Sequence, residues 1–350
     1  MDKERMKCLV QDSQAVSVRF PRIMIAAEKS GGGKTLFTCA LLSLLKEKIQ
    51  EVRAFKCGPD YIDPMFHRTV LEIPSRNLDS FFADGDTLRY LLGREVLEME
   101  KFPESRIAVL EGVMGFYDGL GGVSERSSAW EVADLTDTPV ILLVDMKGRS
   151  LSALASIKGF LDYKEKSHVT GVIFNRLSPM LYPGLKERAE RELGIRVFGY
   201  VPELKNLTLE SRHLGLVMPE EILGIRERLD LIKEKVRAGI NLDGIIEESG
   251  RAAEIVVKLP EAAGRSISDQ STQKTVVAVA KDEAFCFYYE DNLDLLKKLG
   301  AEIQYFSPIH DRNLPEGTCA VYLGGGYPEL HAKALSENIS MRNAIRQAVM

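Results

Sequence analysis

The run Glu28-Lys29-Ser30-Gly31-Gly32-Gly33-Lys34-Thr35 limits what this chain can fold into more than any other stretch. It lies between the apolar residues 23–27, a predicted buried strand, and the helix-like residues 36–48. A strand, a glycine-rich turn and a helix in this order are typical of a phosphate-binding loop, because backbone N–H groups and the helix N-terminus face the phosphates. We expect Lys34 to contact the β- and γ-phosphates and the Thr35 hydroxyl to hold Mg²⁺.

The other predicted nucleotide-binding residues of this loop are Lys29, Ser30, Gly31, Gly32 and Gly33. Glu28 stands where the strict motif has a glycine, so an ordinary glycine-rich turn before a helix is the alternative interpretation. On the phosphate-loop interpretation, the protein uses ATP or GTP.

Composition limits the remaining choices. The chain has 350 residues, 45% of them hydrophobic and 28% charged, which is typical of a globular protein of about two domains. A formal net charge of −5 argues against a nucleic-acid partner. No apolar run reaches the roughly 20 residues of a membrane helix. The five cysteines are scattered and form no C-x-x-C pair, which predicts free thiols and a cytoplasmic location.

From residue 22 on, short apolar runs alternate with longer amphipathic runs, which predicts βαβ units on a mostly parallel sheet. Predicted strands cover residues 23–27, 52–56, 107–111, 140–145, 169–175 and 197–201. Predicted helices cover residues 36–48, 129–136, 151–161 and 181–193. The fold class is therefore α/β, with a doubly wound P-loop sheet. We expect a lead-in at 1–20, this domain at 21–259 with charged helix from 220 onward, a linker at 260–274, and an incomplete second α/β domain at 275–350.

Polar residues stand at the carboxyl ends of four predicted strands, where open α/β sheets bind ligands. They are Lys56, Glu111, Asp145 and Asn175. A buried, unpaired carboxylate is costly, so we expect Glu111, together with Asp60 and Thr35, to hold Mg²⁺. The alternatives are a structural salt bridge at Glu111 and a plain proline/aspartate turn around Asp60.

Further candidate residues lie in the loops. Tyr61, Ile62 and Asp63 would face a substrate, and Asn175 would contact adenine unless it only forms a turn. Arg212 and His213 place a cation beside an imidazole and are candidate substrate-binding residues, although a single histidine is more often structural.

Six stretches together resemble the cobyrinate a,c-diamide synthase family of cobalamin-pathway amidotransferases, whose ATP domain is similar to that of dethiobiotin synthetase. They are Ser30–Thr35, Lys56–Pro64 with Phe66-His67, Ser75–Asp79, Glu111–Gly119, Ser211–Leu216 and Gly324–Glu329. The resemblance implies that ATP phosphorylates the a and c acetate carboxylates of the corrin ring. Ammonia from a C-terminal class I glutaminase-like domain then displaces phosphate.

Carried over by motif, the resemblance assigns roles to the candidate residues. The catalytic group is Lys34, Asp60, Glu111 and Asp118. Thr35, Asp60 and Glu111 would hold Mg²⁺, and Asn175 would meet adenine. Tyr61, Ile62 and Asp63 would lie on the substrate side, with Asp118 in support.

Two departures from the family pattern carry expectations of their own. Lys29 occupies the position of the extra lysine in partition-type ATPases, which suggests a phosphate contact across a homodimer. Neither Cys286 nor Cys319 lies in a nucleophile elbow, and no histidine follows His331. We therefore expect no glutamine hydrolysis by this chain. It would then be a piece of a longer protein, or an enzyme that uses free ammonia or receives ammonia from a separate glutaminase.

Two other functions remain open from the sequence. One is the related amidation of nickel sirohydrochlorin in coenzyme F430 formation, for which arginine would be expected in place of Met114. The other is a partition-type ATPase switch, which Lys29 suggests and the net negative charge opposes.

Overall fold

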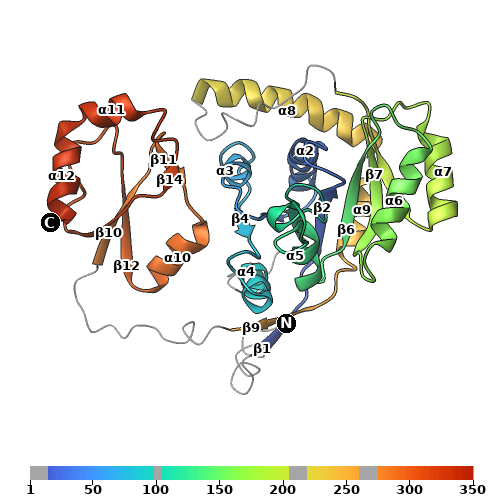
Figure 1. Cartoon of the computed structure of the whole chain (residues 1–350), viewed down its shortest axis with the longest axis horizontal. Helices are drawn as coiled ribbons and strands as arrows, with labels where there is room; N and C mark the ends of the chain where they lie inside the picture. The colour runs from blue at the N-terminus through green and yellow to red at the C-terminus, as the bar shows by residue number, and fades with distance from the viewer. Residues whose placement is uncertain (1–14, 98–104, 205–218, 260–274, 350) are drawn as a thin grey trace. The chain divides into compact units, whose positions relative to one another are not determined.

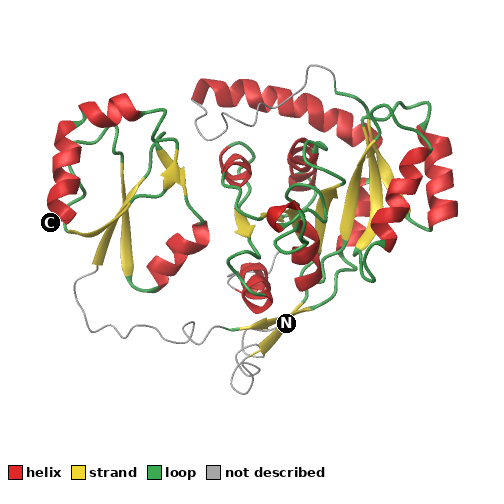
Figure 2. Cartoon of the chain, in the orientation of Figure 1, coloured by secondary structure: helices red, strands yellow, loops and turns green. Residues whose placement is uncertain are grey.

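The computed structural model describes residues 15–97, 105–204, 219–259 and 275–349, without the side chains of 219–223 and 349. These residues form two compact units, the first up to residue 259 and the second from residue 275. Figures 1 and 2 show that each combines helices with a sheet. The predicted linker 260–274 lies outside the described residues. No described helix combines the length and the apolar character needed to cross a lipid bilayer.

A seven-stranded parallel sheet forms the centre of the first unit, in the order β4-β3-β5-β2-β6-β7-β8. The strands are β2 (Arg22–Ala27), β3 (Glu51–Cys57), β4 (Ser75–Leu78), β5 (Arg106–Glu111), β6 (Val140–Asp145), β7 (Val169–Asn175) and β8 (Arg196–Val201). Every residue of β2 and β6 is buried, as expected for parallel strands with both faces covered. The predicted α/β fold class is confirmed.

Helices flank this sheet (Figure 1). They are α2 (Lys34–Lys46), α3 (Ile62–Thr69), α4 (Gly85–Leu97), α5 (Ala129–Leu135), α6 (Ser152–Asp162), α7 (Tyr182–Leu193), α8 (Pro219–Gly239) and α9 (Leu242–Ser249), with a 3₁₀ turn η1 at Leu120–Gly122. Capping residues define where two of these helices begin or end. The Ser128 side chain accepts from the N–H of Glu131 at the start of α5, and Gly194 ends α7 in the left-handed conformation.

The strand order places the phosphate loop at the middle of the sheet. From β2 the chain goes to β3 and β4 on one side, returns through β5, and then adds β6, β7 and β8 on the other side. Ligands bind beside such a reversal, outside the carboxyl ends of the strands. The loop after β2 therefore lies between the ends of β5 and β6, close to Glu111 and Asp145.

The prediction of continuous charged helix from 220 to 259 is wrong in its last part. After α9, Ile255–Lys258 forms β9, which pairs antiparallel with β1 (Ala15–Val18). Residues 255–258 alternate between buried and exposed and are β-branched at three positions, a pattern that favours a strand over a helix. Part of the predicted lead-in is thus a strand of the first unit.

The second unit is built on a three-stranded parallel sheet in the order β12-β10-β13 and a small antiparallel pair, β11 with β14. Its elements are β10 (Thr275–Ala280), β11 (Phe285–Phe287), α10 (Glu290–Lys298), β12 (Ala301–Phe306), β13 (Thr318–Tyr322), β14 (Gly325–Gly326), α11 (Ala332–Glu337) and α12 (Ile339–Val349). Gly326 has a φ of 154°. A Cβ there would lie 2.1 Å from the carbonyl oxygen of Ala284, so the turn requires glycine.

Candidate active site

Residues 28–33 join β2 to α2 in a loop that requires glycine at three positions. Gly31 and Gly33 have φ values of 69° and 88°, a region that costs a residue with a Cβ about 1–2 kcal/mol. At Gly32, a Cβ would lie 2.9 Å from the Cβ of Ala27. The loop thus passes close to its own strand and presents the N-terminus of α2 at the sheet edge, where an anion is favoured.

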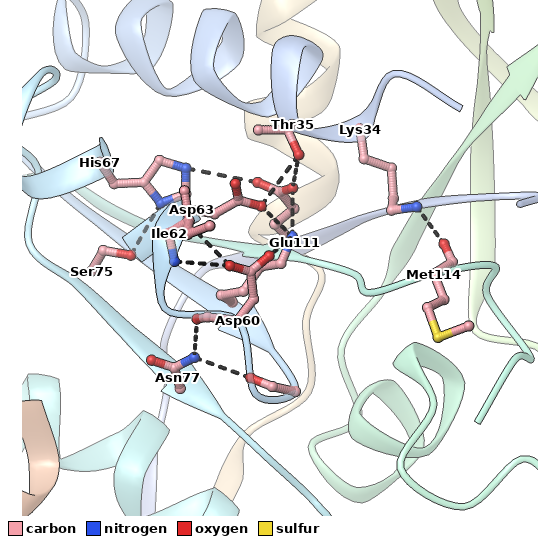
Figure 3. Close-up of polar contacts among 12 residues, drawn as sticks. Lys34, Thr35, Asp60, Ile62, Asp63, His67, Ser75, Asn77, Glu111 and Met114 are labelled. Carbon is pink, nitrogen blue, oxygen red and sulfur yellow. Dashed lines mark hydrogen bonds and ion pairs between the residues drawn. The ribbon is translucent and has the colours of Figure 1, made fainter. Parts of the chain in front are cut away.

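Lys34, the first residue of α2, is buried beneath this loop. Its ammonium group donates to the carbonyl oxygen of Met114 and lies 3.4 Å from that of Lys29 (Figure 3). Burial, and then the positive charge of Lys56, lower the pKa of Lys34 to about 8, although nearby carboxylates oppose the shift. An anionic phosphate would compensate this cation better than the two carbonyl groups do.

Four side chains meet next to the phosphate loop: Thr35, Asp63 and Glu111, which Figure 3 shows, and Lys56. The Thr35 hydroxyl lies 2.8 Å from Glu111 Oε1 and 3.2 Å from Asp63 Oδ2. Lys56, near the end of β3, donates to Glu111 Oε1 at 2.8 Å and to Asp63. We call these four residues the acid–lysine cluster.

The acid–lysine cluster is a buried electrostatic network. The exposed fractions of Lys56, Asp63 and Glu111 are 4%, 5% and 0%. Burial alone would lower the pKa of Lys56, but attraction to Glu111, Asp63 and Asp60 outweighs it and raises the pKa above the ordinary lysine value. Burial and the charge of Glu111 raise the pKa of Asp63, while Lys56 opposes them. Each charge here therefore depends on its neighbours.

Asp60 belongs to the loop that carries Asp63 into the cluster. Its Oδ1 accepts from the backbone N–H groups of Ile62 at 2.9 Å and Asp63 at 3.3 Å, which supports the start of α3. Its Oδ2 lies 3.5 Å from the Lys56 ammonium. The Asn77 amide holds the same loop by donating to the carbonyl oxygen of Asp60 at 2.7 Å.

Sequence reasoning anticipated only part of this arrangement. It expected a metal or a lysine partner for Glu111, and the lysine in the structure is Lys56. It placed Asp63 on the substrate side, which stays a prediction, and did not foresee that Asp63 contacts Thr35 and Lys56. One signal was available: a lysine near the end of a buried strand needs an anionic partner nearby. The partner's position, seven residues later on a separate helix, is set by the tertiary fold.

The oxygen atoms of the acid–lysine cluster suit Mg²⁺. Among the described residues, no group of three or more His, Cys, Asp or Glu side chains could hold a metal by itself. Mg²⁺ usually needs only one or two carboxylates, since waters and phosphate oxygens complete its shell. Thr35 Oγ1 and Glu111 Oε1 lie 2.8 Å apart and offer one hydroxyl and one carboxylate oxygen. The donor chemistry therefore fits this ion.

Glu28 and Lys29 attach the phosphate loop to the end of β6. The Glu28 carboxylate accepts from Arg149 at 2.9 and 3.0 Å and from the backbone N–H of Asp145 at 3.1 Å. The Lys29 ammonium lies 3.3 Å from Asp145 Oδ2, and its side chain is 65% exposed. Asp145 also accepts from Arg176 at 2.9 Å. The non-glycine residue at position 28 thus has a structural role, while a dimer contact through Lys29 stays a prediction.

Asn175, the last residue of β7, contacts the phosphate loop directly. Its Nδ2 donates to the carbonyl oxygen of Gly32 at 2.9 Å, and its Oδ1 accepts from the N–H of Arg176 at 3.0 Å. A Cβ at Gly33 would lie 2.6 Å from the same Nδ2. The amide therefore supports the loop backbone, and the predicted adenine contact stays a prediction.

Replacing Asn175 with alanine should weaken the binding of ATP and GTP equally, by about tenfold. Losing one buried hydrogen bond to the loop costs about 1–1.5 kcal/mol whichever base is present. Equilibrium binding of both nucleotides to the wild type and to Asn175→Ala measures this. A loss of affinity for ATP alone would instead indicate that Asn175 contacts the adenine base.

The remaining sequence candidates are distributed around the site. Asp118 Oδ2 accepts from the N–H of Gly115 at 3.0 Å and so shapes the loop after β5. Asp118 also borders a pocket of about 520 Å³, together with Glu28 and the aromatic residues Tyr117, Phe160 and Tyr163. Tyr61 and Ile62 stand at the start of α3. Arg212 and His213 lie outside the described residues.

Family comparisons agree with this geometry. Residues 23–217 match the model of the CobQ/CobB/MinD/ParA nucleotide binding domain. Residues 276–350 match that of the CobB/CobQ-like glutamine amidotransferase domain. Together with the phosphate loop and the acid–lysine cluster, these matches define the protein as a P-loop enzyme of the ATP-dependent amidoligase class.

Curated relatives extend over nearly the whole chain. It is 40% identical to the cobyrinate a,c-diamide synthase of Listeria innocua, over 93% of this chain and 70% of the relative. The enzymes of that name from Caldanaerobacter subterraneus and Thermoplasma volcanium are each 38% identical, over 93% and 95% of this chain and 69% and 70% of the relatives. The chain belongs to the cobyrinate a,c-diamide synthase family.

Among solved structures, the chain is similar to the signal recognition particle receptor FtsY from Elizabethkingia anophelis in complex with GDP. The identity is 12%, the coverage is 69% of this chain and 67% of that one, and the TM-score is 0.41. The MinC:MinD cell division protein complex of Aquifex aeolicus matches at 14% identity with a TM-score of 0.36, over 62% of this chain and 96% of that one.

Proposed function

We propose that this protein amidates the a and c acetate carboxylates of cobyrinate, with ATP and Mg²⁺, through an acyl-phosphate intermediate in cobalamin biosynthesis. The observation that carries the proposal is the acid–lysine cluster next to the phosphate loop. The cluster and the neighbouring Lys34 provide two ammonium groups, together with hydroxyl and carboxylate oxygens, at the edge where α/β sheets bind ligands. Family membership supports the reaction and the tetrapyrrole substrate.

The carboxylate of the substrate explains why the reaction needs ATP. A carboxylate is a poor acyl donor, and phosphorylation turns one of its oxygens into a leaving group that ammonia can displace. Lys34 would orient the transferred phosphoryl group and stabilise the charge on its oxygens. Mg²⁺, held by Thr35 and Glu111 with Asp60 nearby, would neutralise phosphate oxygens. Lys56 donates to the Glu111 and Asp63 carboxylates, and both carboxylates lie within hydrogen-bond distance of the Thr35 hydroxyl.

The nitrogen source is glutamine or ammonia. A match to a glutamine amidotransferase domain over residues 276–350 supports this class of source.

One incubation series tests the proposal. The full chain is mixed with ATP, MgCl₂ and ammonium, and with either cobyrinate or nickel sirohydrochlorin, and mass spectrometry counts the amides formed. We expect two amides on cobyrinate and none after chelation of Mg²⁺. A preference for the nickel compound would move the function to coenzyme F430 formation. Phosphate release that no tetrapyrrole stimulates would favour an ATPase switch.

A further inference from the structure

His67 lies directly behind Glu111, and none of the roles described above uses it. It is on α3, four residues after Asp63, and is completely buried. Its Nε2 lies 3.7 Å from Glu111 Oε2, on the side of the carboxylate away from Thr35 (Figure 3). On its other side, Nδ1 lies 3.1 Å from the Ser75 hydroxyl of β4.

The two facing atoms lack other partners. His67 Nε2 and Glu111 Oε2 are both buried, and neither has a hydrogen-bond partner among the described residues. An unmade hydrogen bond costs about 1–3 kcal/mol for each buried polar atom. Their separation of 3.7 Å exceeds the usual hydrogen-bond length of about 2.7–3.2 Å, so a hydrogen bond between them requires the two side chains to move closer by roughly half an ångström.

The Glu111 carboxylate and the Ser75 hydroxyl together favour one tautomer of a neutral His67. Ser75 can donate to Nδ1, which leaves the hydrogen of a neutral imidazole on Nε2, facing the carboxylate. The opposite tautomer would direct the Nε2 lone pair at a negatively charged oxygen, which is repulsive. The arrangement Ser75–His67–Glu111 therefore favours an Nε2–H group as the donor.

We propose that His67 is a positioning residue for Glu111, which donates from Nε2 to Glu111 Oε2 and so directs Oε1 at Thr35 and Lys56. Glu111 then has one oxygen fixed from behind and the other presented at the phosphate loop. The inference rests on the proposed function where it concerns Mg²⁺. Outer partners of this kind commonly change metal affinity or activity by about 10–100-fold.

Two matched variants test the donor. A glutamine amide can occupy the place of the histidine Nε2–H, and an asparagine amide the place of Nδ1. We expect His67→Asn to raise the Mg²⁺ concentration for half-maximal amidation by about 10–100-fold, and His67→Gln to recover most of that loss. Equal Mg²⁺ dependence in the two variants, whatever their thermal stability, would overturn the proposal.

A second measurement needs neither Mg²⁺ nor catalysis. In the ¹⁵N-histidine NMR spectrum of the free wild-type protein near neutral pH, we expect the His67 signals of the Nε2–H tautomer, and those of the Nδ1–H tautomer would overturn the proposal. Only the Nε2–H tautomer can donate to Glu111 Oε2. If wild-type amidation proves independent of Mg²⁺ while this tautomer is found, the metal proposal fails and the positioning of Glu111 stands.

Discussion

Replacing Lys56 with methionine should destabilise the first unit by about 3–5 kcal/mol and abolish amidation. The ammonium group compensates Asp63 and Glu111, which are nearly or fully buried, and removing one partner of a buried ion pair leaves an uncompensated charge. Methionine approximately preserves the volume of the side chain, so the loss of unfolding free energy measures the effect of removing the charge. Denaturant unfolding, followed by the fluorescence of the single Trp130, measures the free energy.

The stability of Lys56→Met should also depend on pH in a defined direction. Without the lysine, burial raises the carboxyl pKa values of the folded protein above their unfolded values, so the folded state binds more protons. Its stability should therefore increase as the pH falls from about 7 toward 5. Lys48→Met is the matched control, because Lys48 pairs with Asp243 at the surface at 2.7 Å, and we expect less than about 1 kcal/mol there. A Lys56→Met loss independent of pH would contradict the buried-charge explanation.

Replacing Glu111 with glutamine should reduce kcat by about 10²–10³-fold while the protein stays folded. Glu111 Oε1 accepts from Thr35 and from Lys56, and an uncharged amide weakens both contacts and the proposed Mg²⁺ site. Steady-state amidation rates at saturating ATP, together with circular dichroism, measure the two effects separately.

Glu95 provides a matched control for Glu111. It is also a buried carboxylate, but it pairs with Arg53 at 3.4 Å and with Arg76, away from the phosphate loop. Glu95→Gln should lower stability and leave kcat near the wild-type value. If Glu95→Gln and Glu111→Gln reduced kcat equally, the effect of Glu111 would be structural only.

The centre of the fold could be predicted because its signals are local. The apolar strands β2, β5 and β6 are nearly continuous runs of buried residues, and the phosphate loop follows one of them directly. Because parallel strands end at a common edge, Glu111, Asp145 and Asn175 could be placed together before any contact was known. All three do end strands of one sheet.

The strands and contacts that could not be predicted depend on residues far away in the sequence. The strand Ser75–Leu78 has three polar or charged residues in four and is a strand because β3 offers its edge. In the same way, β1 and β9 stabilise each other, although they lie far apart in the sequence. The role of Lys56 arises from carboxylates on β5 and α3, and no spacing along the chain encodes that meeting.

The pairing of β1 with β9 has a consequence for modularity. The described segments that begin and finish the first unit, Ala15–Val18 and Ile255–Lys258, are neighbouring strands of one ribbon. The first and last described strands of this unit therefore lie side by side. Such a unit can be joined to a different partner domain, or circularly permuted by a short bridge between these strands, without rearranging the sheet that carries the phosphate loop.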